Sequence, residues 1–175
     1  MKSRIAFAVA GYIALAASGA VAQQVSDNQV AERTDWSVFE GSEPRECWAV
    51  SAPKETVNTK DGRTVSVRRG DILLMAFFRP GAEVAGQITF TGGYPFRDGS
   101  TVNLNVDGTE FELFTEGEWA WPASPSEDSK ILTAMKRGSS AVVTGVSGRG
   151  TATKDTFSLL GFTAMVEEAE KRCTN

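Results

Sequence analysis

Short runs of alternating apolar and polar residues recur along this chain, and residues that favour turns separate them. Strands that bury one face have this period of two, whereas a helix repeats its apolar positions every three or four residues. Nine runs at this spacing predict an antiparallel all-β fold, either a sandwich or a barrel-like sheet. The runs are residues 36–39, 47–50, 64–68, 72–78, 84–90, 101–106, 110–114, 141–146 and 151–157.

Turn signals between the runs support this fold class. Asp61-Gly62 and Asp107-Gly108 each join two runs, and this dipeptide favours the positive φ angles of a tight hairpin. Around the second pair the alternation predicts a hairpin with one core face and one wet face. Residues 72–78 are apolar almost throughout, which predicts a central strand covered on both faces and ended by Pro80.

Two segments have helical patterns instead. Near residues 126–137, Ser126 is a candidate cap, acidic residues follow it, and Lys136 and Arg137 precede Gly138. This order suits the helix dipole and predicts a short helix ended by the glycine.

The second helix is expected near residues 161–173. Apolar side chains at Phe162, Met165, Val166 and Ala169 share one face, so the helix is amphipathic. Cys173 lies eleven residues after Phe162 and returns to that face, because each residue turns the helix by about 100°. Its side chain should therefore point at the body of the protein.

The N-terminus has the three parts of a secretory signal. Lys2 and Arg4 precede an apolar run at residues 5–17, and Ala20-Val21-Ala22 fits the pattern for cleavage. This predicts a cleavable signal peptide at 1–22, a flexible polar leader at 23–34 and a single domain at 35–175. The run is shorter than the roughly 20 residues that span a bilayer, so no transmembrane segment is expected in the mature chain. The predicted location is the periplasm, with outer-membrane association as an alternative.

Cys47 and Cys173 are the only cysteines and bracket most of the predicted domain. An oxidising compartment pairs neighbouring cysteines, and two cysteines allow one connectivity, so a Cys47–Cys173 disulfide is predicted. A reactive thiol is the disfavoured alternative.

Composition removes several classes of function. Without Lys2 and Arg4, 16 basic residues face 22 acidic ones, a net charge of −6 that disfavours nucleic acid as a partner. The chain has no histidine, which excludes a Ser-His-Asp triad and an ordinary catalytic zinc site. The glycine-rich stretch at 145–151 lacks the lysine of a phosphate loop and is interpreted as a turn. No cofactor or metal is expected.

One segment carries candidate functional residues. Residues 107–128 hold seven acidic side chains and no basic one, together with aromatic residues. Paired carboxylates can hydrolyse glycosides, and tryptophans can stack on sugars, so a carbohydrate site is one interpretation. The more ordinary one is a solvated hairpin face whose tryptophans cap a core edge. The candidate binding residues are Glu116, Glu118, Trp119 and Trp121.

A modest basic stretch lies earlier in the chain. It is most simply a solvated hairpin face, although it could meet an acidic partner or the acidic segment of another copy. Its members are Lys54, Lys60, Arg63, Arg68 and Arg69, which outnumber Glu55 and Asp61.

Several short motifs together resemble the invasion-associated locus B family of alphaproteobacteria, over essentially the whole predicted mature chain. They are Asp35-Trp36-Ser37, Cys47-Trp48-Ala49-Val50-Ser51, Gly93-Tyr94-Pro95-Phe96, and Phe157-Ser158-Leu159-Leu160-Gly161-Phe162-Thr163-Ala164 leading to Glu170-Lys171-Arg172-Cys173.

The resemblance implies an exported, envelope-associated protein linked in pathogens to host-cell entry, with no agreed molecular activity. Many members carry further cysteines in mid-domain, whereas residues 115–124 contain none. The favoured function is a non-enzymatic envelope protein with an unidentified protein or glycan partner. The alternative is a carboxylate-based glycan hydrolase or a carbohydrate-binding module.

Overall fold

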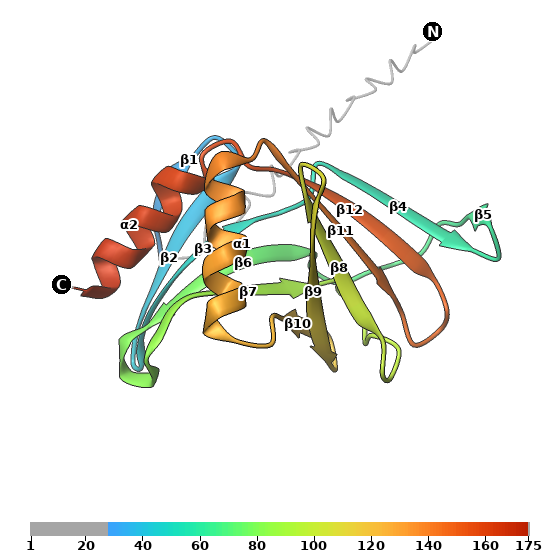
Figure 1. Cartoon of the computed structure of the whole chain (residues 1–175), viewed down its shortest axis with the longest axis horizontal. Coiled ribbons are helices and arrows are strands. Elements are labelled where there is room, and N and C mark those ends of the chain that lie inside the picture. The colour runs from blue at the N-terminus through green and yellow to red at the C-terminus, as the bar shows by residue number, and fades with distance from the viewer. Residues whose placement is uncertain (1–27, 175) are drawn as a thin grey trace, which may run out of the picture.

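Residues 28–174 are described by the computed structural model, in which twelve strands form one antiparallel sheet with two α-helices on its inner face (Figure 1). The strands are β1 (Gln29–Arg33), β2 (Trp36–Ser42), β3 (Arg45–Ser51), β4 (Glu55–Lys60), β5 (Arg63–Thr64), β6 (Leu73–Arg79), β7 (Val84–Thr91), β8 (Thr101–Val106), β9 (Thr109–Glu116), β10 (Trp119–Trp121), β11 (Ser140–Val146) and β12 (Ala152–Ser158). The helices are α1 (Pro125–Arg137) and α2 (Phe162–Thr174), with one 3₁₀ turn, η1 (Pro80–Ala82).

The sheet is curled but not closed into a barrel. Its strand order is β1-β2-β3-β6-β7-β10-β9-β8-β11-β12-β4-β5. Although β7 and β12 are five places apart in that order, the rings of Phe90 and Phe157 meet at 6.2 Å between centroids. The inner faces of the two halves therefore share one core, to which the helices add Phe162 and Ile131. The predicted all-β antiparallel class with two helices is confirmed.

Eight of the nine alternating runs lie on strands, and the run at 64–68 is the exception. The β4–β5 hairpin forms at Asp61-Gly62, which has the expected positive φ angles, but β5 ends at Thr64. Beyond it, the chain leaves the sheet edge because the Arg69 side chain turns inward to Asp155 on β12. The hairpin at Asp107-Gly108 matches its prediction. Strand β6 is central and is followed by Pro80 as expected, but it is not fully covered on both faces, because its outward side chains Leu73 and Phe77 are only half-buried.

The expected flexible leader at 23–34 is wrong over residues 29–33. This stretch forms β1, which pairs with β2 at the edge of the sheet. Its side chains are largely exposed, so β1 is held by backbone pairing and has no strong apolar alternation to reveal it. The predicted signal peptide at 1–22 and the start of the leader lie outside the described residues.

Both helices occur where they are expected, with one correction at the start of α1. Ser124, not Ser126, caps the helix: its hydroxyl accepts the Glu127 N–H, and Pro125 takes the first helical position. In α2 the predicted apolar face is buried, and Phe162 packs edge-on against Trp36 of β2 with ring centroids 4.7 Å apart.

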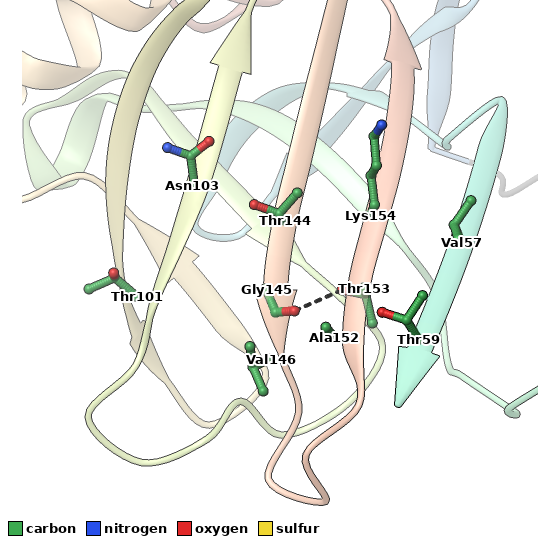
Figure 2. Close-up of a pocket in the computed structure, with 10 residues that line it drawn as sticks. All are labelled: Val57, Thr59, Thr101, Asn103, Thr144, Gly145, Val146, Ala152, Thr153 and Lys154. Carbon is green, nitrogen blue, oxygen red and sulfur yellow. Dashed lines mark hydrogen bonds between the residues drawn. The ribbon is translucent and has the colours of Figure 1, made fainter. Parts of the chain in front are cut away.

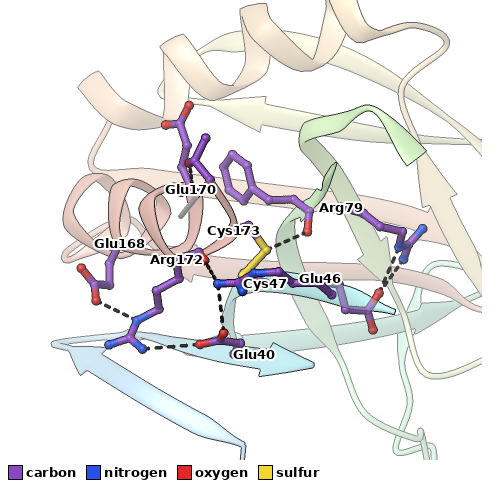
Figure 3. The surroundings of a disulfide bond; sticks show 11 residues. Glu40, Glu46, Cys47, Arg79, Glu168, Glu170, Arg172 and Cys173 are labelled. Carbon is purple, nitrogen blue, oxygen red and sulfur yellow. Dashed lines mark hydrogen bonds and ion pairs between the residues drawn. A yellow bond between two sulfur atoms is a disulfide. The ribbon is translucent and has the colours of Figure 1, made fainter. Parts of the chain in front are cut away.

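The predicted disulfide joins the end of α2 to β3 (Figure 3). Cys47 and Cys173 are both buried, with Cα atoms 5.8 Å apart. Around them, Arg172 donates to Glu168 at 2.7 Å, and Arg45 reaches the Arg172 carbonyl oxygen from the strand side. These contacts and the disulfide fix the last turn of α2 on the sheet.

Candidate functional site

Two large aromatic side chains are exposed on the outer face of the sheet, at the β9–β10 hairpin. Phe114 is 47% exposed and Trp119 is 44% exposed. Their neighbours Leu113 and Ala120 point inward and are fully buried, so strand alternation directs the aromatic rings to solvent. Gly117, with φ of 58°, allows the tight turn that brings the two strands together.

The structure brings together three of the four predicted binding residues. Glu116 and Trp119 are directly opposite in the β9–β10 ladder, and half-buried Trp121 is opposite Phe114. Because directly paired residues share a face, all four lie on the outer face. Glu118 lies in the turn between β9 and β10 and lines a cleft with Tyr94 and Arg149.

Beside the aromatic residues, a shallow groove of about 430 Å³ crosses the outer face of β8, β11, β12 and β4 (Figure 2). Thr101, which is paired with Phe114, connects the groove to the aromatic rings. The outward side chains that line it are mostly polar or small, and Figure 2 draws them along neighbouring strands: Thr101, Asn103, Thr144, Val146, Ala152, Lys154, Val57 and Thr59. The groove's residues were not predicted, since exposed threonines on strands have no distinctive pattern.

A separate cleft of about 400 Å³ lies beside Tyr94. Next to it, Arg69 and Asp155 form a bidentate ion pair, at 2.7 Å and 2.6 Å, whose side chains are 6% and 0% exposed. Arg69 also donates to the Gly92 carbonyl oxygen at 2.8 Å, and its guanidinium lies 5.0 Å from the centre of the Tyr94 ring. Burial raises the pKa of Tyr94, whose hydroxyl bonds to that of Thr153 at 2.6 Å.

The basic stretch of the sequence is therefore divided in the structure. Arg69 is buried in this network, and Lys54 pairs with Asp35, whose pKa is lowered mainly by that contact. Arg68 lines the cleft, together with Arg149 from the glycine-rich turn. Sequence reasoning missed this convergence because the two arginines are 81 positions apart.

Asp128 of α1 is a buried carboxylate at the edge of β7. Its Oδ1 accepts the Ile88 N–H at 2.8 Å, just beyond the point where β10 stops pairing with β7. Burial raises the pKa of Asp128, and the Ile88 hydrogen bond only partly opposes this shift. The carboxylate thus replaces a missing strand partner and anchors α1 to the sheet.

An Asp128→Asn variant should be more stable than the parent protein at pH 7. Because the folded-state pKa lies above the unfolded one, the native state holds the extra proton between the two values. The free energy of unfolding of the parent protein therefore falls as pH rises through that window. The amide of Asn does not ionise, so the variant does not lose this stability, and its side-chain oxygen can still accept the Ile88 N–H. Urea unfolding should show the advantage at pH 7 and its disappearance near pH 3.

Asp128→Ala is the matched control for this prediction. It leaves the buried Ile88 N–H without an acceptor, so it should be less stable than the parent protein at both pH values. A parent protein more stable than Asp128→Asn at pH 7 would contradict the assignment.

Comparison of the chain with protein-family models, curated proteins and solved structures found no match. Within residues 28–174, no group of three or more His, Cys, Asp and Glu side chains is placed to hold a metal ion. Among the described helices, none combines the length and the apolar character needed to cross a membrane.

Proposed function

We propose that this protein is a non-catalytic binding protein whose outer sheet face binds a glycan chain. The observation that carries this proposal is the position of exposed Phe114 and Trp119 beside the shallow groove of Figure 2, whose lining mixes apolar surface with Asn103, Lys154 and threonine hydroxyls. A sugar ring can lay its C–H face on an aromatic ring while its hydroxyls bond to polar side chains at the edge. Both kinds of contact are available within one continuous surface.

The surroundings of the aromatic rings favour a glycan over a protein. Stable protein interfaces bury about 800 Å² on each partner, with an apolar core at their centre. Here the two exposed rings are flanked by Glu112, Glu116 and Thr101, and the adjacent groove contains Asn103 and Lys154. This mixture suits a partner that is polar throughout its length.

The placement of the carboxylates supports binding without hydrolysis. Glycosidases hold two carboxyl groups about 5 to 9.5 Å apart on either side of the bond that they cleave. Glu116 lies on the outer face of β9, while Glu118 lines the cleft beside Tyr94, and we therefore assign the two carboxylates to different surfaces and not to one cleaved bond.

The cellular setting of the proposal comes from the sequence. The signal-like N-terminus and the paired cysteines support export to the periplasm, where envelope glycan is abundant. The resemblance to the invasion-associated locus B family supports an envelope role and, in a pathogen, contact with host cells.

Single variants Phe114→Ala and Trp119→Ala test the proposal. Calorimetric titration with chitohexaose, cellohexaose and soluble β-glucan should give saturable binding to at least one, weakened by about tenfold or more in each variant. Because both side chains are exposed, the variants should unfold within about 0.5 kcal/mol of the parent protein. Leu160→Ala, which removes an exposed apolar side chain elsewhere, should bind normally.

Absence of saturable binding to all three glycans, or binding unchanged in Trp119→Ala, would contradict the proposal. Release of shortened glycan that Glu116→Gln abolishes would favour the hydrolase instead.

A further inference from the structure

The cleft beside Tyr94 has a charge opposite to that of the whole protein. Arg68 and Arg149 line it, and in residues 28–174 neither guanidinium takes part in an ion pair or a side-chain hydrogen bond. Glu118 is the one carboxylate among the lining residues. Asp155 is not one of them, and its charge is neutralised by the ion pair with Arg69. A cation-lined cleft in a chain of net charge −4 attracts anions locally.

The turn that carries Arg149 is rigid. Its backbone is closed by Ser147 N–H to the Thr151 carbonyl oxygen at 2.9 Å and by Gly150 N–H to the Ser147 carbonyl oxygen at 2.8 Å. The Ser147 hydroxyl accepts the Thr151 N–H at 3.1 Å. A further bond from Gly148 N–H to the Pro95 carbonyl oxygen, 2.9 Å, ties the turn to the segment beside Tyr94. The backbone that carries Arg149 is therefore held in place before any ligand arrives.

The segment that carries Arg68 is held just as firmly, although it is not a strand. The neighbouring Arg69 side chain is clamped by Asp155, and Gly70 donates its N–H to the Gly93 carbonyl oxygen at 2.9 Å. The two glycine backbones touch: a Cβ at Gly93 would lie 2.6 Å from the Gly70 carbonyl oxygen. The buried network thus holds the backbone of both walls of the cleft, and such preorganisation lowers the entropy lost on binding.

We propose that this cleft binds a small molecule through a carboxylate or phosphate group held by Arg68 and Arg149. Guanidinium groups match the geometry of both oxyanions and form their strongest bonds with them. On the floor of the cleft the Tyr94 hydroxyl is already bonded to that of Thr153, whereas the guanidinium groups of Arg68 and Arg149 have unused donors. A volume of about 400 Å³ suits a ligand of metabolite size. This site is separate from the outer sheet face and does not depend on glycan binding there.

Titration of the full exported chain with sodium glucuronate, glucose 6-phosphate and glucose tests the proposal. Calorimetry at about 0.1 M salt should show saturable binding of at least one of the two anions and none of glucose, and which anion binds identifies the oxyanion. Arg68→Gln and Arg149→Gln should each weaken binding about tenfold or more, because each removes a charge-assisted hydrogen bond. Glu118→Gln should strengthen it, since it removes the negative charge at the rim.

Arg63→Gln is the matched control, because it removes an exposed arginine on β5 that does not line the cleft. It should leave the affinity almost unchanged at 0.1 M salt, where charges more than about 10 Å apart are screened. The proposal fails if neither anion binds saturably below 10 mM (about the weakest affinity worth assigning to a site), if glucose binds equally well, or if Arg63→Gln weakens binding as much as Arg149→Gln.

Discussion

Replacing Asp155 by Asn is expected to lower the free energy of unfolding by about 3–5 kcal/mol, the usual cost of leaving a buried charge without its partner. The carboxylate is fully buried on β12 and receives both Nη atoms of Arg69, whose side chain is only 6% exposed. Arg69→Met should cost a similar amount, because it leaves the Asp155 carboxylate buried and unpaired. Chemical unfolding of both variants measures these losses.

The double variant Arg69→Met with Asp155→Asn separates the ion pair from packing. With neither charge present, it should be closer in stability to the parent protein than either single variant, which gives a large favourable coupling in the double-mutant cycle. Lys54→Met breaks a more exposed ion pair with Asp35 and should cost less than about 1 kcal/mol. Additive losses in the cycle would contradict a direct pairing.

Removing the disulfide should cost about 2–5 kcal/mol, because Cys47 and Cys173 close a loop of 126 positions and restrict the unfolded chain. The first part to loosen should be the C-terminal turn of α2, which the bond holds on β3. In the variant Cys47→Ala with Cys173→Ala, hydrogen exchange should accelerate there. Near Phe162 it should change less, because that residue packs on Trp36.

Reduction of the parent protein is the control for this prediction. It breaks the same bond without removing side chains, so its loss of stability should be close to that of the double alanine variant. Unfolding curves that are unchanged by reduction would show that the bond adds nothing to stability.

The sheet was predictable wherever one strand face is buried. Strands β8 and β9 alternate clearly because Leu104 and Leu113 face the core, and Asp107-Gly108 fixes the turn between them. The short or polar strands β1, β4 and β10 were missed, since backbone pairing with a neighbour holds them. Helix periodicity was equally informative: it predicted the direction of Cys173 and hence how α2 is attached.

The candidate site was predictable only in part. Strand alternation places Glu116 and Trp119 on one face, but the turn at Gly117 directs Glu118 to another surface, and turn geometry of this kind is not encoded in residue spacing. The alternation at 64–68 was overridden by the buried pairing of Arg69 with Asp155, an interaction between positions 86 apart. Residues that meet only through such long-range pairing, including Arg68 and Arg149, cannot be found by local pattern.

Backbone amide NMR of the parent protein during titration with the tightest-binding glycan most directly tests the claim that the outer sheet face is the binding surface. Shifts should concentrate on β8, β9 and β10 around Thr101, Phe114 and Trp119, with few changes at Tyr94 or in α2. Shifts centred on the cleft beside Tyr94, or spread evenly over the protein, would contradict that claim.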